Sequence, residues 1–242
     1  MSNIEWFKQA KYGMMLHWGL YSLLGGEYKG KRVRDYAEWI QSYFQIPNRE
    51  YEKLASAFNP IGFDAEKYAE FAVKCGMKYI VITAKHHDGF AMYHSQVDSF
   101  NIMDHTGFTR DVLDEVVQSC RRHGMKFGFY YSQIEDWTHP GGTAGRRMMK
   151  EGWPNPDSTR INQYIMEHEG HWDPVQLTKS FDEFFEEVSL PQIRELLSRY
   201  PDVSTIFFDY PKVISSEQAQ KIMDVIKKNP KCVQGEFKMI AK

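Results

Sequence analysis

The sequence has 242 residues, of which 42% are hydrophobic, and a chain of this size is long enough to bury the core of one α/β barrel. Its 30 basic and 32 acidic residues give a net charge of -2, so nothing in the charge indicates nucleic acid or an anionic membrane as a partner. No apolar run reaches the roughly 18 residues of a membrane span, and residues 1–9 lack the apolar stretch of a secretory signal.

Short apolar strands alternate with amphipathic helices along the chain. The predicted strands are residues 12–18, 77–83, 126–131 and 204–209; the predicted helices are residues 63–75, 112–120, 181–188, 193–197 and 215–228. We expect Asp64 to be an N-cap, Gly76 and Gly124 to end helices, and Ser215 with Gln218 to form a capping box. Alternation of this kind implies βαβ units and a parallel sheet, either doubly wound or closed into a barrel.

The three cysteines form an odd and sparse set that predicts neither a disulfide framework nor a metal cluster. Cys75 and Cys120 lie on predicted apolar helix faces, where we expect buried free thiols. Aromatic residues make up 15% of the chain, a share that suits a dense core and also the stacking of sugar rings.

Polar residues gather where the predicted strands end. They are His17, His86, His87, Asp88, Tyr130, Tyr131, Ser132, Asp136 and Asp209. In an α/β barrel the carboxyl ends of the strands carry the active site, so this placement favours a barrel over a doubly wound sheet.

Each of these residues has more than one interpretation. Asp209 follows an apolar strand and suits a nucleophile that forms a glycosyl-enzyme, but it also suits a turn before Pro211. The histidines His86 and His87 suit metal ligands, partners of sugar hydroxyls or structural groups. Because adjacent strand residues point to opposite faces, both reach one site only if the backbone bends there. A carboxylate beside an indole can accept hydroxyl bonds and stack on a sugar, which Glu38 and Trp39 would do.

Five ordered motifs resemble those of glycoside hydrolase family 29, the α-L-fucosidases. They are residues 12–22 (YGMMLHWGLYS), Glu38-Trp39 with residues 58–60 (FNP), residues 84–90 (AKHHDGF), residues 126–132 (KFGFYYS) with Asp136-Trp137, and residues 207–209 (FFD). The resemblance runs from about Ile4 to Asn229 and implies a TIM-type (β/α)8 barrel. It also implies a retaining α-L-fucosidase that releases terminal fucose from glycans by double displacement, without a metal or an organic cofactor.

The resemblance assigns the site residue by residue. Asp209 matches the nucleophile, and the substrate-binding positions are His17, Glu38, Trp39, His86, His87 and Tyr131, with Tyr130 as the alternative to Tyr131. The implied partner is a fucosylated glycan or oligosaccharide, and members of the family are often extracytoplasmic or lysosomal.

The sequence departs from the family pattern after Asp209. Phe207 stands where many members have Trp, and residues 233–237 read Val-Gln-Gly-Glu-Phe where the family has Val-Asn-Asp-Arg or Val-Asn-Asn-Arg. The general acid/base has no matching position, and Glu236 is the one carboxylate near the expected place. About five of eight strands are present, so residues 1–242 are expected to be the N-terminal portion of a single catalytic barrel domain.

Three functions therefore remain as alternatives: an α-L-fucosidase, an inactive fragment or fucose-binding pseudoenzyme, and a metal-dependent hydrolase that uses His17, His86 and His87. An unclosed barrel should also self-associate through uncovered apolar surface. We expect that surface to include Ile80, Ile82, Phe127, Phe129, Ile206 and Phe208.

Overall fold

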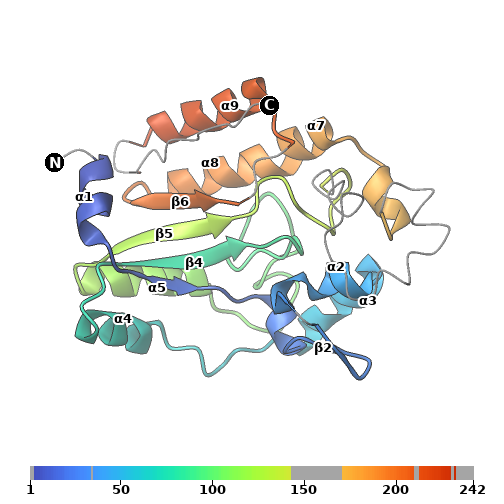
Figure 1. Cartoon of the computed structure of the whole chain (residues 1–242), viewed down its shortest axis with the longest axis horizontal. Helices are drawn as coiled ribbons and strands as arrows, with labels where there is room; N and C mark the ends of the chain where they lie inside the picture. The colour runs from blue at the N-terminus through green and yellow to red at the C-terminus, as the bar shows by residue number, and fades with distance from the viewer. Residues whose placement is uncertain (1–2, 34, 143–170, 210–212, 230–231, 233–242) are drawn as a thin grey trace.

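The computed structural model describes residues 3–33, 35–142, 171–209, 213–229 and 232. Its centre is a parallel sheet of four strands in the order β1-β4-β5-β6, with bounds Met14–Leu16, Tyr79–Lys85, Lys126–Tyr131 and Thr205–Phe208 (Figure 1). Each strand pairs with the strand that precedes it in the sheet, and the order never reverses. This one-directional order is that of a barrel, of which these four strands form an incomplete part. The fifth expected strand, at residues 233–237, lies outside the described residues.

Helices follow the strands as the sequence predicts. The larger ones are α1 (Asn3–Ala10), α4 (Ala65–Lys74), α5 (Val112–Arg122), α8 (Leu190–Arg199) and α9 (Ser216–Lys227). Between β1 and α4 lie the 3-10 turns η1 (Leu20–Leu23), η2 (Ala37–Trp39) and η3 (Lys53–Ala57), the hairpin β2 (Glu27–Tyr28) with β3 (Lys31–Arg32), and the short helices α2 (Ile40–Phe44) and α3 (Asn48–Glu52). The 3-10 turn η6 (Pro174–Leu177) precedes α7.

The helix ends confirm the expected caps. The Asp64 carboxylate accepts a hydrogen bond from the backbone N–H of Lys67, and Ser215 and Gln218 form the reciprocal capping box of α9. The two helical segments around Pro191 form one run, because α7 (Phe181–Phe184) continues through the π-helical turn η7 (Phe185–Ser189) into α8. Pro191 lies in the first turn of α8, where its missing N–H is tolerated.

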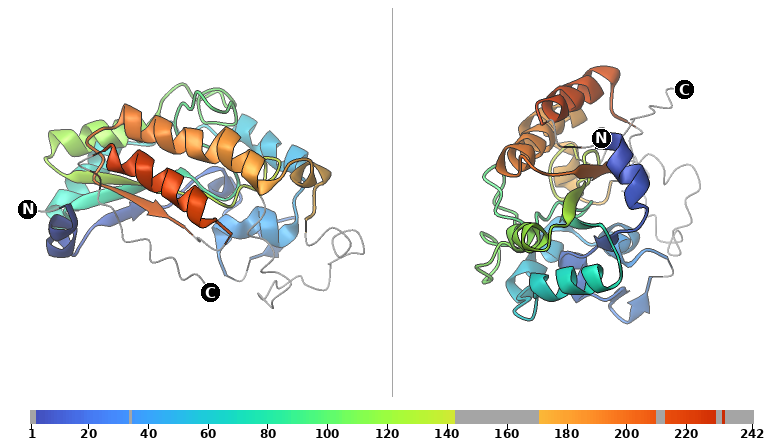
Figure 2. Two further views of the ribbon diagram at one scale, coloured as in Figure 1. Left: turned by 90° about the horizontal axis from the view of Figure 1, so that it is seen from above. Right: turned by 90° about the vertical axis from the view of Figure 1, so that its left-hand side faces the viewer.

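The two faces of the sheet have different surroundings. Side chains at alternate positions pack against the helices; they are Ile80, Ile82, Phe127 and Phe129, all at most 3% exposed, with Ile206 and Phe208 partly buried beside them. The right-hand view of Figure 2 shows α4, α5 and α8 curving around one side of the sheet. The opposite face, which would line a barrel, exposes Met15 (45%) and Phe207 (51%). We expected these six side chains to form an uncovered apolar surface, and this expectation is wrong. Because side chains alternate along a strand, all six point toward the helices, and the opposite face of the sheet stays open.

The amino ends of the strands are covered by α1. The ring of Trp6 meets that of Tyr79 edge to face, with the ring centroids 5.9 Å apart, and the Lys126 ammonium lies 5.6 Å from the Trp6 ring. No helix in the described part of the chain is long and apolar enough to cross a membrane.

The three cysteines are free thiols, as expected, with Cys120 and Cys232 buried. The predicted burial of Cys75 is wrong, because α4 ends at Lys74 and Cys75 is its exposed C-cap. The chain turns away from the helix at the next residue, Gly76, which has φ +75°.

Candidate functional site

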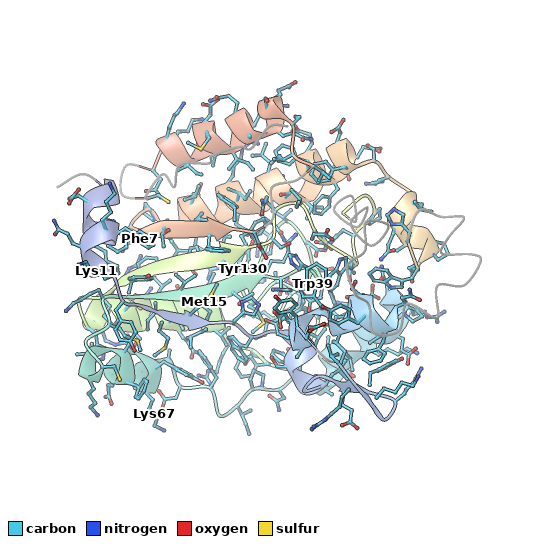
Figure 3. The ribbon with its side chains drawn as sticks, viewed as in Figure 1. Phe7, Lys11, Met15, Trp39, Lys67 and Tyr130 are labelled. Atoms are coloured by element: carbon cyan, nitrogen blue, oxygen red, sulfur yellow. The ribbon has the colours of Figure 1, made fainter. Side chains whose placement is uncertain are left out.

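The carboxyl ends of the strands bring together side chains that lie far apart in the sequence. His17 follows β1, Glu38 and Trp39 belong to η2, and Asp209 directly follows β6. Figure 3 shows Trp39 and Tyr130 at this end of the sheet, and Phe7 of α1 with Lys11, the residue after α1, at the other. The location is that of an active site in a barrel enzyme.

A β-bulge at the end of β4 turns His86 toward this site. Thr83 pairs with Tyr130 of β5, but the next pair is Lys85 with Tyr131, so Ala84 is an extra residue in the ladder. Lys85 consequently faces the helix layer, where its ammonium lies 5.0 Å from the Tyr131 ring. His86 then faces the opposite way and stacks on Tyr130, with the ring centroids 5.2 Å apart.

His87 reaches the same site from the turn that follows the bulge. The centroids of its ring and that of His86 are 4.3 Å apart, and the Trp39 ring meets His87 edge to face at 5.0 Å. The bend required for both histidines to reach one site is therefore present in the backbone.

Asp209 is held by two of these neighbours. The Tyr130 hydroxyl donates a hydrogen bond of 2.7 Å to Oδ2 of Asp209, and Nε2 of His87 lies 3.5 Å from the same oxygen. Burial raises the pKa of the Asp209 carboxyl, but the interactions with His87 and Tyr130 lower it more, so it lies below its ordinary value. The side chain stays 38% exposed. Asp209 is thus an ionised carboxylate with open access, as a nucleophile requires.

A chain of hydrogen bonds fixes the ring of His87. The Ser132 hydroxyl donates to the carbonyl of Glu135 at 2.7 Å, so it accepts from Nδ1 of His87 at 2.6 Å. Because Nδ1 is the donor in this chain of hydrogen bonds, Nε2 is the ring nitrogen that faces Asp209.

His17, Glu38 and His86 form a second group beside Asp209, each offering a ligand atom within 4.8 Å of the others. Burial lowers the pKa of both histidines, outweighing the opposing effect of Glu38 on His17, so both rings are neutral at pH 7. Nδ1 of His86 is buried without a hydrogen-bond partner. Neutral imidazoles and a carboxylate can bind several hydroxyl groups of one ligand or a metal ion.

Two residues noted at the strand ends do not join the site. Tyr131 is fully buried toward the helices, and its hydroxyl donates to Oε1 of Gln192 in α8 at 2.7 Å. Adjacent strand residues face opposite sides, so the geometry replaces Tyr131 with Tyr130, the alternative in the doublet.

Asp88 also lies outside the site. Its carboxyl accepts a hydrogen bond from the Tyr51 hydroxyl at 2.8 Å, and burial raises the pKa of Asp88 to about 6.

A buried charge network behind the site was not predicted as a unit. Nζ of Lys85 lies 2.8 Å from Oδ2 of Asp136, and both side chains are inaccessible. Nδ1 of His139 is 2.8 Å from the same oxygen, and Nε2 of His139 is 2.8 Å from Asp98. Burial opposes the charge on His139, but Asp136 and Asp98 raise its pKa to about 9. One sequence feature could have indicated this network. Lys85 ends a buried strand, and a buried lysine requires a carboxylate partner.

The comparisons with known proteins agree with these motifs. The model of the family described as alpha-L-fucosidase matches residues 2–236. The unliganded α-L-fucosidase AlfC from Lactobacillus casei is 48% identical, with a TM-score of 0.83 over 96% of this chain and 68% of that chain. The α-L-fucosidase from Vibrio sp. strain EJY3 is 35% identical, with a TM-score of 0.79 over 96% of this chain and 37% of that chain.

Curated relatives match over a shorter stretch. The human plasma α-L-fucosidase is 35% identical over 144 residues, which are 56% of this chain and 30% of that protein. The chain thus spans a minor part of the length of that relative. The structural neighbours belong to glycoside hydrolase family 29, whose catalytic domain is of the TIM type. Since the family model covers nearly all of its residues, this chain belongs to the α-L-fucosidase family.

Proposed function

We propose that this site binds a terminal α-L-fucose residue of a glycan and hydrolyses its glycosidic bond with retention of configuration. The observation that carries the proposal is the ionised, accessible carboxylate of Asp209 beside polar side chains that have no hydrogen-bond or ion-pair partner among the described residues. In the described residues, no hydrogen bond or ion pair engages the side chains of His17, Glu38 or His86. Such a group suits the hydroxyls of a sugar.

Each side chain has a distinct role in this proposal. An oxygen of Asp209 attacks the anomeric carbon, the bond to the glycosidic oxygen breaks, and a glycosyl-enzyme ester forms. The Tyr130 hydroxyl orients the carboxylate. His87 forms a hydrogen bond with a sugar hydroxyl through Nε2, and the indole of Trp39 forms an apolar wall beside it. Water then cleaves the ester and returns the carboxylate.

The substrate class follows from structures of the relatives. An Asp-to-Ala variant of AlfC has been solved with 4-nitrophenyl-α-L-fucopyranoside, and such a variant also with Fucα(1,6)GlcNAc. We extend this class of fucosylated ligand to the present chain. Residues 1–242 would then form part of a single catalytic domain.

The general acid is the open part of the mechanism. Within the part of the chain that the structure describes, the hydrogen bond and the ion pair of the Asp209 carboxylate are with Tyr130 and His87, neither of which is a carboxyl group. Glu236, the carboxylate nearest the expected place in the sequence, lies outside the described residues. A second candidate function is fucose binding without turnover. A leaving group that needs no protonation separates the two functions.

The test uses 2,4-dinitrophenyl α-L-fucopyranoside, whose phenolate leaves without an acid. We expect measurable release by the chain and a loss of at least about 10³-fold in Asp209→Asn, with fucose binding retained in calorimetry. Asp224→Asn, an exposed carboxyl on α9, is the matched control and should be unchanged. Proton NMR of the first sugar released should show the α anomer. Near-normal turnover in Asp209→Asn would exclude Asp209 as nucleophile, and binding without release would establish the second candidate.

A further inference from the structure

We propose that His17, Glu38 and His86 also form a site for a zinc ion, and that zinc and the sugar exclude each other there. Zinc binding itself follows from the three side chains. The exclusion rests on the proposed function, because it requires the same side chains to bind the sugar. Zinc would therefore be an inhibitor of this site and take no part in the reaction.

The donor set is that of a zinc site with an open position. Two imidazoles and one carboxylate, with water as the fourth ligand, satisfy tetrahedral zinc. The three ligand atoms lie within 4.8 Å of one another, whereas bonds of about 2.0–2.1 Å place neighbouring donors roughly 3.3 Å apart. The widest pair must approach by about 1.5 Å. Neither His17 nor Glu38 has a hydrogen bond or ion pair in the described residues that this movement would break.

His86 is the fixed member of the group. Its side chain is 2% exposed and lies between the rings of Tyr130 and His17, with ring centroids 5.2 Å and 4.8 Å away. One of its nitrogens, Nδ1, is buried and has no partner. An unpartnered polar atom at this depth indicates a ligand that the protein alone does not supply.

The two imidazoles of the group have no hydrogen bond or ion pair within the described part of the chain, so they are available to a metal as well as to a sugar. The other buried histidine beside two carboxylates, His139, is already engaged by Asp136 and Asp98. The free lone pairs are therefore at His17 and His86. With three protein ligands and an open fourth position, we expect a Kd on the order of micromolar, weaker than that of structural zinc.

The experiment is isothermal titration of the EDTA-treated, dialysed chain with ZnCl₂, and with MgCl₂ as the hard-cation comparison. We expect one zinc per chain and no heat from magnesium. Glu38→Gln and His86→Ala should each weaken zinc binding at least tenfold, while His105→Ala, an exposed histidine outside the group, should not. Circular dichroism verifies that each variant is folded. Glu38→Gln keeps the test valid if His86→Ala is misfolded, because Glu38 is partly exposed.

Competition is measured by repeating the titration in saturating L-fucose, where the apparent Kd for zinc should rise at least tenfold. Absence of zinc binding, or binding that neither variant weakens, would overturn the site. Binding that fucose leaves unchanged would overturn the exclusion. If the chain binds zinc but neither binds fucose nor releases dinitrophenol, the zinc site stands and the proposed function is rejected. Failure of the zinc site and failure of the proposed function therefore give different results.

Discussion

The candidate site has two halves that differ in how firmly they are held. Tyr130 belongs to the central strand β5, and His86 and His87 directly follow the central strand β4; all three are at most 2% exposed. His17 and Asp209 follow β1 and β6, the outer strands of the described sheet, and both remain accessible. The comparison indicates that the histidine pair and Tyr130 are preorganised, whereas the geometry at Asp209 depends on contacts that the central half provides.

The central half is rigid because the segments that follow β4 and β5 are bonded to each other. The backbone N–H of Trp137 donates to the carbonyl of His87 at 2.7 Å, and Lys85 and Asp136 form the buried ion pair. Gly89 has φ +80°, and a Cβ there would overlap the carboxylate of Asp136. The charge network and the histidine turn are therefore packed directly on each other.

The largest effect should follow from removing the charge of Asp136. Asp136→Asn leaves the buried ammonium of Lys85 and the imidazolium of His139 without their carboxylate. We expect a loss of about 3–5 kcal/mol in the free energy of unfolding, measured in urea. Asp202→Asn, which breaks a more exposed ion pair with Arg121, should cost about 1 kcal/mol or less. Equal effects of the two variants would contradict the distinction between the halves.

A pH-dependent effect should follow from His139. Its pKa in the folded chain is raised to about 9, above the ordinary value of 6.5, so its charge contributes stability fully below pH 6.5 and progressively less as pH rises through 9. His139→Gln should therefore cost roughly 2–3 kcal/mol at pH 6 and much less at pH 10, by urea unfolding at both values. A cost that does not change with pH would show that the network uses neutral His139.

The smallest effect on stability should come from the open face of the sheet. Phe207→Ser and Met15→Ser replace side chains that are about half exposed, so each should change the free energy of unfolding by about 0.5 kcal/mol or less. The double variant should form fewer oligomers in light scattering if this face mediates self-association. Phe129→Ser, on the buried face of β5, is the contrast and should cost several times more. Unchanged association in the double variant would assign it to another surface.

Local features were the most predictable from the sequence. The caps at Asp64 and Ser215 depend on a few neighbouring residues, and the strand order follows from the alternation of strands and helices. The choice between Tyr130 and Tyr131 depends on which face of β5 packs against the helices. The residues near the doublet do not indicate that face. The ion pair of Lys85 joins residues 51 positions apart, so its partner could be found only from the fold.

The open face shows a similar limit. Apolar residues occur at both alternate sets of strand positions, as is usual when both faces of a sheet are covered. The sequence pattern therefore could not say that Ile80 and Phe129 face helices while Met15 and Phe207 face outward. That distinction depends on which face of the sheet the helices cover.

The single extra residue at Ala84 has a consequence for how this segment can vary in length. Deleting Ala84 would remove the bulge but leave Lys85 opposite Tyr131, so the ammonium would stay toward the helices and the His86 ring toward the site. Pairing Ala84 itself with Tyr131 would instead turn the ammonium toward the site and the ring toward the helices, although every chemical group of the site would still be encoded. Surface turns such as Lys29-Gly30 in the hairpin have no such coupling between length and orientation. Changes of length should therefore be tolerated at the hairpin, and between Thr83 and His87 only where they leave Lys85 opposite Tyr131.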